Sequence, residues 1–281
     1  MSTVTSPEPS LTQKLQRAAR VGKGFTSDIY EWGERRVLKL FHGWVPAYRA
    51  QREFKVTRAI HAAGLPAPAT YELITIDGRY GIVFERVEGL SMLRHVQAKP
   101  WTLFTAVRCL AELHAQIHCC VSPIELPSQR EWIACGIDRA PELSAAQKQA
   151  TQKALAALPV GTALCHGDFH PENVLFAARG PVVIDWETAT RGDPLGDVAC
   201  TSRLIQDASL PPWAPRYMHC LLKCSRALLH RSYLNRYLQL RGGTRRQIEN
   251  WKAPLNAAAT SWRVPRTSPE LESASSNPSY G

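Results

Sequence analysis

The most constraining feature of this sequence is a pair of polar segments joined by a short apolar hairpin. The first segment is HGDFHPEN at residues 166–173, and the second begins at Asp185. Two apolar runs, VLF and VVI, lie between them and are separated by a turn through Arg179 and Gly180. Because a hairpin brings its two ends together, we expect the polar residues of both segments to meet at its mouth.

The oxygen-bearing residues in these segments have the spacing that phosphoryl transfer requires. Four residues separate Asp168 from Asn173, as in the catalytic-loop pattern H-x-D-x-x-x-x-N, and Asp185 follows twelve residues after Asn173. The Asp168 carboxylate can accept a hydrogen bond from a substrate hydroxyl, while Asn173 and Asp185 can bind a divalent metal. A site with oxygen ligands alone favours magnesium.

The rest of the chain divides into a sheet-rich part and a helix-rich part. Residues 21–32 and 36–41 predict two strands around a turn at Gly33, and a helix over 48–63 ends at Gly64. A second hairpin, over 71–76 and 80–85, turns at Asp77-Gly78. After Gly89 the pattern is helical, first over 101–117 and, past Asp197, over 198–206, 214–240 and 244–260.

The motifs HGDFHPENVLF and VVIDWETATRGDPLGDVA resemble the aminoglycoside phosphotransferase and choline kinase-like family, over residues 20–265. The resemblance implies an α+β, two-lobed protein-kinase-like fold, with a small antiparallel-sheet N-lobe carrying one main helix and a larger, mostly helical C-lobe. It also implies that Asp168 is the catalytic base and that Asn173 and Asp185 hold magnesium. His166 then opens the catalytic loop and Asp197 braces it. We interpret His170 as a structural residue of the same loop.

The resemblance assigns nucleotide-binding roles in the N-lobe. Lys39 resembles the lysine that neutralises the ATP phosphates, and Glu53 resembles its ion-pair partner. Gly22, Gly24 and Ser27 resemble the phosphate-covering loop, although Ser27 stands where protein kinases have a third glycine. The stretch VFERVEG resembles the hinge, where the carbonyl of Glu85 and the amide of Val87 are expected to bind adenine.

The acceptor is expected to be a hydroxyl of a small molecule. Only six residues separate Asp185 from the Gly192-Asp193-Pro194 motif, which leaves no room for a peptide-docking segment. From Cys200 to Gly281 the chain has twelve Lys or Arg but only four Asp or Glu. Polycationic acceptors need carboxylates, so a neutral or anionic acceptor is favoured. Its identity, the regiochemistry and the choice of ATP over GTP are not fixed by the sequence.

Composition and local pattern set the expected boundaries and context. We expect a flexible lead-in at 1–18, the N-lobe at 19–88, the C-lobe with its acceptor pocket at 89–266, and a disordered tail at 267–281. The sequence has no run of eighteen apolar residues and no signal peptide, so we expect a cytoplasmic protein with no membrane partner.

Two alternatives to a kinase stay open. The chain could be a catalytically silent relative that keeps the fold and binds nucleotide or a partner, although Lys39, Asp168, Asn173 and Asp185 are all intact. The net charge of +10 could instead serve a polyanion binder acting through the basic C-terminal helices. We do not expect a nucleic-acid partner, since no basic motif interleaved with aromatic residues is present.

Overall fold

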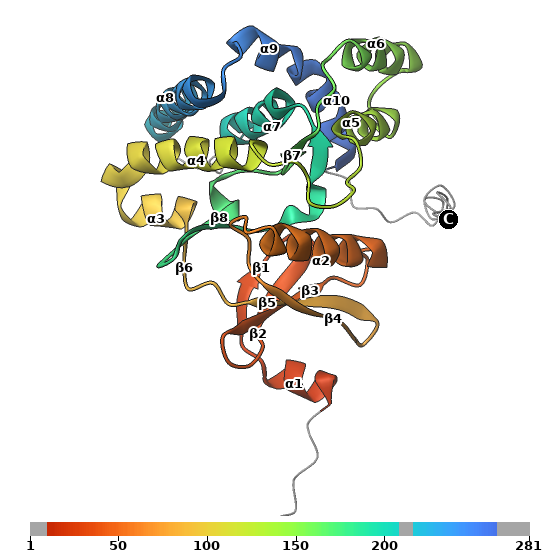
Figure 1. The fold of residues 1–281 in the computed structure, drawn as a ribbon, viewed down its shortest axis with the longest axis vertical. Coiled ribbons are helices and arrows are strands. Elements are labelled where there is room, and N and C mark those ends of the chain that lie inside the picture. The colour runs from red at the N-terminus through yellow and green to blue at the C-terminus, as the bar shows by residue number, and fades with distance from the viewer. Residues whose placement is uncertain (1–9, 208–215, 263–281) are drawn as a thin grey trace, which may run out of the picture.

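The computed structural model describes residues 10–207 and 216–262, with side chains of the last helices described from residue 227 onward. Figure 1 shows a smaller lobe of sheet with one long helix, and above it a larger, mainly helical lobe. This arrangement agrees with the predicted two-lobed fold.

The smaller lobe is built on a five-stranded antiparallel sheet in the order β1-β2-β3-β5-β4. Its strands are β1 (Arg20–Lys23), β2 (Ser27–Glu31), β3 (Arg36–Phe41), β4 (Thr70–Ile76) and β5 (Arg79–Glu85). One face of the sheet packs Phe41, Ile82 and Phe84 against Ala50 of helix α2 (Ala47–Ala62). The other face buries Leu38 and Leu40, among others, under helix α1 (Leu11–Arg17).

The sequence predicted one strand over 21–32, but the structure has two there. The Gly24 amide donates to the Ser27 carbonyl (2.8 Å), which folds β1 back onto β2. Helix α1 also differs from expectation, since it lies inside the segment predicted as a flexible lead-in. A capping box at Ser10 and Gln13 starts this helix.

The larger lobe contains eight α-helices, three short 3-10 helices (η) and five short strands in the described ranges. These are β6 (Gly89–Ser91), α3 (Met92–Ala98), η1 (Pro100–Thr102), α4 (Leu103–His118), α5 (Gln129–Asp138), α6 (Ala145–Ala156), β7 (Ala163–Cys165), η2 (Pro171–Asn173), β8 (Val174–Ala177), β9 (Gly180–Val183), η3 (Trp186–Thr188), β10 (Thr190–Gly192), α7 (Pro194–Asp207), α8 (Arg216–Arg241), α9 (Arg245–Asn250) and α10 (Lys252–Trp262).

Helix α4 forms the spine of this lobe because its apolar stripe is buried. Leu110, Leu113 and Ile117 are at most 4% exposed, and burial of a side chain of this size contributes roughly 1.5–3 kcal/mol. Figure 1 shows α7 and α8 on one side of α4 and the strand β8 on the other. The helix therefore fixes the position of the strands and loops that face the smaller lobe.

The predicted hairpin between the polar segments is present as β8 and β9, which pair antiparallel from Val174↔Val183 to Ala177↔Gly180. The second expected hairpin, β4 and β5, turns at Asp77-Gly78 as predicted. The helix predicted over 244–260 is divided into α9 and α10 at Trp251. The predicted tail at 267–281 lies outside the described residues.

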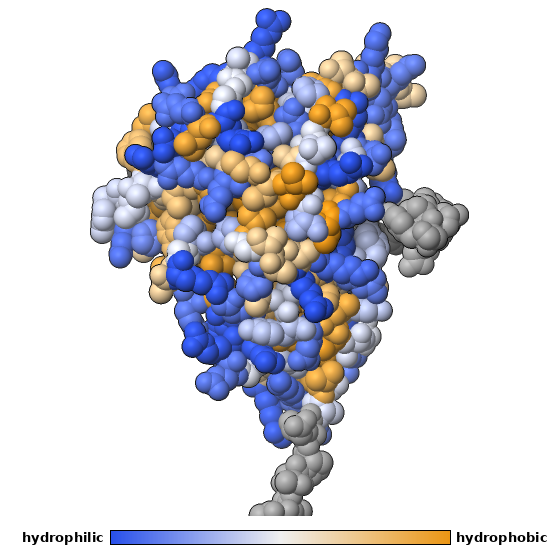
Figure 2. Space-filling view, in the orientation of Figure 1, coloured by the Kyte–Doolittle hydropathy of each residue, from blue (hydrophilic) through white to orange (hydrophobic). Residues whose placement is uncertain are grey.

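The outer surface is mixed in character. Figure 2 shows hydrophobic residues interspersed with hydrophilic ones on the face that it views. Within residues 10–207 and 216–262, no helix is both long enough and apolar enough to cross a membrane.

Candidate active site

The loop at residues 166–173 follows strand β7 and is fixed by a buried carboxylate beneath it. Asp197, on α7, accepts hydrogen bonds from the backbone amides of His166 (2.6 Å) and Gly167 (2.9 Å). Gly167 has φ of 80°, and a Cβ there would meet the Thr188 carbonyl oxygen at 2.6 Å. The loop therefore requires glycine at this position, and Asp197 lies where it can brace the loop.

The His166 side chain connects this loop to the end of the hairpin. Its Nε2 lies 3.1 Å from the Ile184 carbonyl oxygen, and its Nδ1 accepts from the Asp168 amide at 3.2 Å. Burial lowers the pKa of His166, so the ring is neutral, donating through Nε2 and accepting through Nδ1. One ring thus ties together the backbones next to Asp168 and Asp185.

Asp168, Asn173 and His170 lie together in the loop. The Asn173 amide nitrogen donates to the Asp168 carbonyl (2.9 Å) and to its carboxylate (3.3 Å), which leaves the Asn173 side-chain oxygen available for a metal. His170 Nε2 lies 3.7 Å from Asp168 Oδ2. Burial alone would lower the pKa of His170, but the Asp168 carboxylate raises it above its ordinary value. The His170 ring thus faces the Asp168 carboxylate through Nε2, while its Nδ1 accepts from the Glu172 amide (3.3 Å).

Three segments far apart in sequence meet at Lys39. Its Nζ lies 2.8 Å from both carboxylate oxygens of Glu53, on α2, and 3.0 Å from Oδ1 of Asp185. Burial alone would lower the pKa of Lys39, but the carboxylates of Asp185 and Glu53 outweigh burial and raise it. Burial would likewise raise the pKa of Asp185, and Lys39 holds it below its usual value. Both groups are therefore charged.

Sequence reasoning missed a second link between α2 and the hairpin end. Arg49 forms a two-point ion pair with Glu187 (Nη2 to Oε2, 2.8 Å), and Arg52 donates to the Ala189 carbonyl. Arg52 also lies over the Trp132 ring, 4.7 Å from its centre. The sequence shows that Glu187 follows Asp185 by two residues, but it gives no indication that Arg49 is the partner of Glu187.

The carboxylates around Lys39 provide oxygen donors suited to magnesium. Oxygen atoms of Glu53, Asp185 and Glu187 lie within 4.8 Å of one another. Lys39 contacts both oxygens of Glu53, and Arg49 contacts both oxygens of Glu187. Lys39 contacts Asp185 through Oδ1, and the left-handed backbone of Asp185 (φ 66°) marks the end of the hairpin. Asp185, with the Asn173 oxygen, is accordingly the residue best placed to hold the metal.

The remaining predicted residues lie at the edge of the smaller lobe. Gly22 and Gly24 belong to the β1–β2 hairpin, and the Ser27 side chain is buried inside it, with its residue 4% exposed. Glu85 ends β5 and its carboxylate pairs with Arg179 (Nη2 to Oε2, 2.9 Å). Val87 lies in the connection to β6, between the two lobes.

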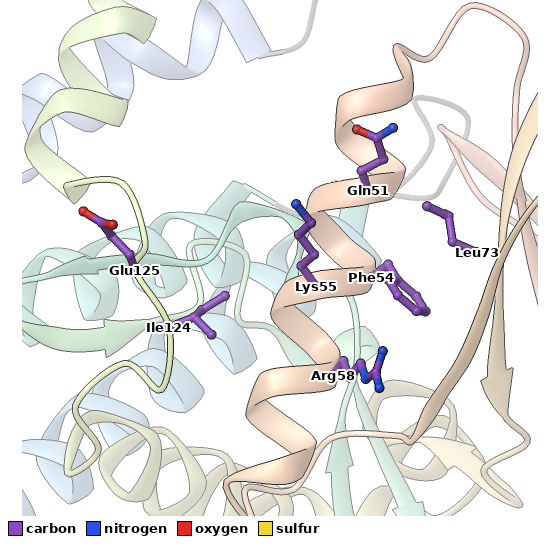
Figure 3. Close-up of a pocket in the computed structure, with 7 residues that line it drawn as sticks. All are labelled: Gln51, Phe54, Lys55, Arg58, Leu73, Ile124 and Glu125. Atoms are coloured by element: carbon purple, nitrogen blue, oxygen red, sulfur yellow. The ribbon is translucent and has the colours of Figure 1, made fainter. Parts of the chain in front are cut away.

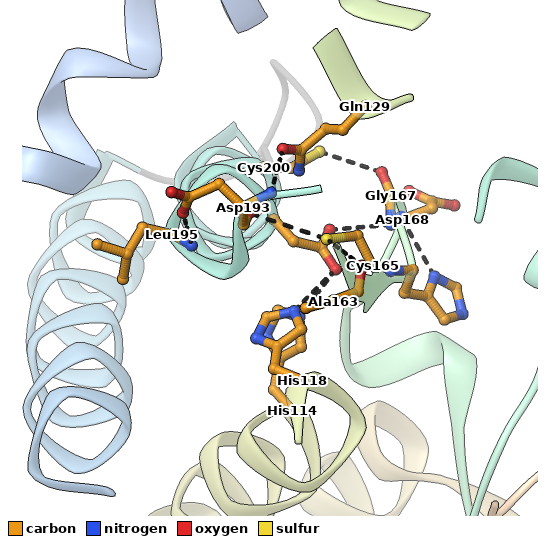
Figure 4. Close-up of polar contacts among 12 residues, drawn as sticks. His114, His118, Gln129, Ala163, Cys165, Gly167, Asp168, Asp193, Leu195 and Cys200 are labelled. Atoms are coloured by element: carbon orange, nitrogen blue, oxygen red, sulfur yellow. Dashed lines mark hydrogen bonds and ion pairs between the residues drawn. The ribbon is translucent and has the colours of Figure 1, made fainter. Parts of the chain in front are cut away.

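A buried polar network beneath the loop was also missed. His114 and His118, on α4, both contact the Asp197 carboxylate, and Figure 4 shows their rings side by side below the segment that carries Cys165, Gly167 and Asp168. The signal was present in the sequence: two histidines four residues apart on an otherwise apolar helix face. Asp197 is therefore shared between the loop and α4.

The outer face of α2 bounds a separate groove of about 820 Å³, shown in Figure 3. It is lined by Gln51, Phe54, Lys55, Arg58, Leu73, Ile124 and Glu125. None of the predicted site residues lines it. The groove is thus distinct from the cluster around Lys39 and from the loop that carries Asp168.

A small antiparallel lobe stacked on a larger helical lobe, with polar residues of both meeting between them, is the architecture of protein-kinase-like phosphotransferases. The chain belongs to the phosphotransferase enzyme family, whose family model matches residues 17–232. The predicted family and fold are therefore confirmed.

Solved structures of other phosphotransferases have the same fold as this chain. The chain resembles the solved structure of an aminoglycoside-3'-phosphotransferase of type VIII, with TM-score 0.61 and 17% identity over 86% of this chain and 93% of that one. It also resembles amicoumacin kinase hAmiN, solved with AMP-PNP, Ca²⁺ and Ami, with TM-score 0.58 and 13% identity over 92% and 85% of the two chains.

A curated relative is acyl-CoA dehydrogenase family member 10 of Mus musculus, 28% identical over 177 residues. The match covers 54% of this chain but only 16% of that protein. About half of this chain thus matches a small part of a much longer relative.

Proposed function

We propose that this chain transfers the γ-phosphoryl group of ATP to a hydroxyl of a small molecule, with magnesium as cofactor. The observation that carries the proposal is the position of Lys39, which joins Glu53 of α2 to Asp185 at the hairpin end. A charged lysine held between the lobes is placed to neutralise phosphates, as phosphoryl transfer requires. The AMP-PNP and Ca²⁺ in the amicoumacin kinase structure support a nucleotide and a divalent metal here.

The nucleotide is assigned to the smaller lobe, residues 19–88. Adenine binds at the connection after β5, through the Glu85 carbonyl and the Val87 amide. The β1–β2 hairpin, with Gly22 and Gly24, covers the phosphates. Because Ser27 is buried, we assign it to the shape of this hairpin and to backbone contact with phosphate.

The acceptor side of the reaction is assigned to residues 89–266. Asp168 accepts the hydrogen bond of the acceptor hydroxyl, and the oxygen attacks the γ-phosphorus as its bond to ADP breaks. The hydroxyl proton passes to Asp168 and then to solvent. Asn173 and Asp185 hold magnesium, which when bound neutralises charge on the phosphate oxygens. Catalysis rests mainly on positioning and electrostatics.

The acceptor is a small molecule because β10 and α7 follow Asp185 almost at once. The chain passes from Asp185 through η3 and β10 into α7, which starts at Pro194. That leaves no long segment on which a peptide could dock. We further propose a cytoplasmic enzyme that acts on a neutral or anionic hydroxyl compound.

The test is magnesium-dependent ATP consumption over a panel of aminoglycosides, choline, sugars, amino alcohols and nucleosides. Wild type is compared with Asp168→Asn, which keeps shape and hydrogen bonding but not the negative charge. Acceptor-dependent turnover that falls by about a thousandfold or more in the variant supports the proposal. Nucleotide binding without turnover on any acceptor would favour a silent relative, and no nucleotide binding would reject the proposal.

A further inference from the structure

The proposed mechanism does not explain why the Asp197 carboxylate accepts so many hydrogen bonds. Its carboxylate receives the two loop amides already described and also contacts Nε2 of His114 (3.1 Å) and Nε2 of His118 (3.2 Å). Asp197 and both imidazole rings are fully shielded from solvent. A carboxylate buried this way stays charged only if such donors surround it.

Helix α8 supplies the far end of the same network. The Tyr233 hydroxyl lies 2.6 Å from His114 Nδ1, and the Tyr237 hydroxyl lies 2.6 Å from His118 Nδ1. Both tyrosines have 0% exposure. The spacing of four residues recurs on α4 and α8, so each helix contributes one matched pair from successive turns.

The proton positions in the network follow from Asp197. Burial alone would raise its pKa, but hydrogen bonds from the two histidines hold the pKa well below its usual value, so the group is an acceptor only. Both Nε2 atoms must then carry protons. Burial lowers the pKa of His114 to about 3, so its ring is neutral and its Nδ1 has a free lone pair. The Tyr233 hydroxyl therefore donates to it.

The second branch has the same direction. The guanidinium of Arg241, one turn after Tyr237 on α8, donates to the His118 carbonyl oxygen (3.2 Å) and so ties the end of α4 to α8. With its Nε2 proton directed at Asp197, a neutral His118 ring has a lone pair on Nδ1, and the Tyr237 hydroxyl donates to that atom. Two parallel chains of hydrogen bonds thus run from α8 through α4 to Asp197.

The cluster is not a metal site. Ligand atoms of His114, His118 and Asp197 do lie within 4.8 Å of one another. The Nε2 atoms of both histidines and Oδ2 of Asp197 are already committed to hydrogen bonds with one another, and each Nδ1 is paired with a tyrosine hydroxyl. A metal bound here would displace the Nε2 protons of His114 and His118, and so would break the two hydrogen bonds that these rings donate to Asp197.

We propose that Tyr233 and Tyr237 are positioning residues for the phosphoryl transfer, which fix the catalytic loop through the two histidines and Asp197. The inference rests on the proposed function. Each hydroxyl holds one imidazole in the Nε2–H form, and each imidazole holds Asp197 against the amides of His166 and Gly167. Asp168 is the next residue. Helix α8 therefore controls where the catalytic carboxylate sits.

The consequence of losing one hydroxyl is a small displacement with a large kinetic effect. Without Tyr237, His118 can rotate or change tautomer, because Nδ1 loses its donor. Asp197 then loses one of four hydrogen bonds, and the loop that it holds shifts. Since a misplacement of about 1 Å in a reacting group can cost about a hundredfold in rate, partial loosening should cost about tenfold.

The experiment compares Tyr233→Phe, Tyr237→Phe and the double variant with wild type and with Tyr71→Phe. Tyr71 lies on β4 in the other lobe and is exposed, so its variant is a control for the loss of a tyrosine hydroxyl. We expect kcat per folded molecule to fall about tenfold in each single variant, with the KM for ATP changed by less than about twofold. His118→Gln, whose amide can donate to Asp197, should retain more activity than His118→Ala.

The proposal is overturned if kcat per folded molecule is unchanged while only thermal stability falls, since that is what a purely structural role predicts. A second measurement does not depend on activity. Nitrogen-15 and carbon-13 NMR of labelled histidine should show the Nε2–H tautomer at positions 114 and 118 in wild type and its loss in the matching Tyr→Phe variant. A Nδ1–H tautomer in wild type would overturn the proposal even if the chain is an active kinase. If wild type shows the Nε2–H tautomers but turns over no acceptor, the result counts against the proposed function and not against this network.

Discussion

Lys39 is the residue on which the two lobes converge, and its surroundings decide what its removal should do. Its ammonium is buried and balances Glu53 and Asp185 at 2.8 and 3.0 Å. Removing it deletes the cation that we propose for the phosphates, and it leaves the carboxylates of Glu53 and Asp185 without their shared counter-ion. Lysine at this position is therefore the counter-ion of Glu53 and Asp185 and, in the proposed function, a ligand for nucleotide.

The first prediction concerns Lys39→Met, which keeps the length of the side chain and removes its charge. ATP affinity should fall by about tenfold to a hundredfold, since one charged hydrogen bond contributes about 1.5–3 kcal/mol. Calorimetric titration of the nucleotide measures it. Lys55→Met, on the outer groove of α2, is the control and should bind ATP as wild type does. Equal affinity of both variants would remove Lys39 from the nucleotide site.

The second prediction concerns the pH dependence of stability that His114 imposes. The pKa of His114 is about 3 in the folded chain, because burial disfavours the charged ring, against an ordinary value of 6.5. Between these values the unfolded chain binds a proton that the folded chain does not. The free energy of unfolding should therefore be highest above about pH 7 and should fall with acidification, at up to about 1.4 kcal/mol per pH unit from this residue.

Urea unfolding of wild type and His114→Gln at about pH 7 and about pH 5 tests this slope. The glutamine cannot take up a proton, so the variant should lose less stability than wild type on acidification. The comparison isolates His114 from the other buried histidines, which both chains share. Parallel loss of stability in the two chains would contradict a neutral, buried His114.

Helix α2 is the element that links the larger lobe to Lys39 and so to the proposed nucleotide site. It carries Glu53 toward Lys39, and its first turns are fastened to the hairpin end by Arg49 with Glu187 and by Arg52 with Ala189. The helix thus has one set of contacts to each lobe. Its position is fixed by side chains close to Asp185.

The third prediction is that Arg49→Gln loosens this attachment. Glu187 would remain in a largely buried place without its ion pair, so stability should fall by about 1–3 kcal/mol. The KM for ATP should also rise, because Glu53 lies on α2 and moves when the helix is less firmly attached. Arg36→Gln is the matched control: its ion pair with Glu72 is exposed and 3.8 Å long, so its loss should cost less than about 1 kcal/mol. If Arg49→Gln and Arg36→Gln had equal effects on the free energy of unfolding and on the KM for ATP, Arg49 would not attach α2 to the larger lobe.

Elements that have a local stop or turn signal were predictable from the sequence. Helix α2 ends before Gly64, and β4 and β5 meet at Asp77-Gly78, as predicted. The division of α9 from α10 was missed because both halves have helical pattern. Pro254 lacks an amide hydrogen and fits the first turn of a helix, so a new helix starts just before it, at Lys252.

The same distinction holds for the site. The sequence could predict the cluster of Asp168, Asn173 and Asp185, because one short hairpin joins these residues and their spacing is visible in the sequence. The partners of Glu187 and Asp197 could not, since Arg49, His114 and Tyr233 come from helices whose packing depends on the whole fold. Periodicity shows that a helix face is buried but does not show which residue it faces. The roles of all these residues remain predictions.

On the scale of the whole molecule, the distribution of charge bears on the acceptor. The chain carries a formal net charge of +10, and its last third has twelve basic and four acidic residues. The proposed acceptor pocket lies partly on those C-terminal helices. A positive field raises the local concentration of anions and lowers that of cations. The family includes enzymes for polycationic aminoglycosides, but this balance of charge opposes that use.

The fourth prediction is therefore that turnover depends on the charge of the acceptor. Kanamycin should have a kcat/KM at least about a hundredfold below that of the best neutral or anionic hydroxyl compound in the panel. Glucose and glucosamine form a matched pair that differs by one amino group, and the cationic member should be the poorer substrate. The difference should shrink as salt is added, because screening weakens a field effect but not a steric one. Efficient phosphorylation of kanamycin at micromolar concentration would overturn the charge argument, whereas a salt-independent preference would place selectivity in the shape of the pocket.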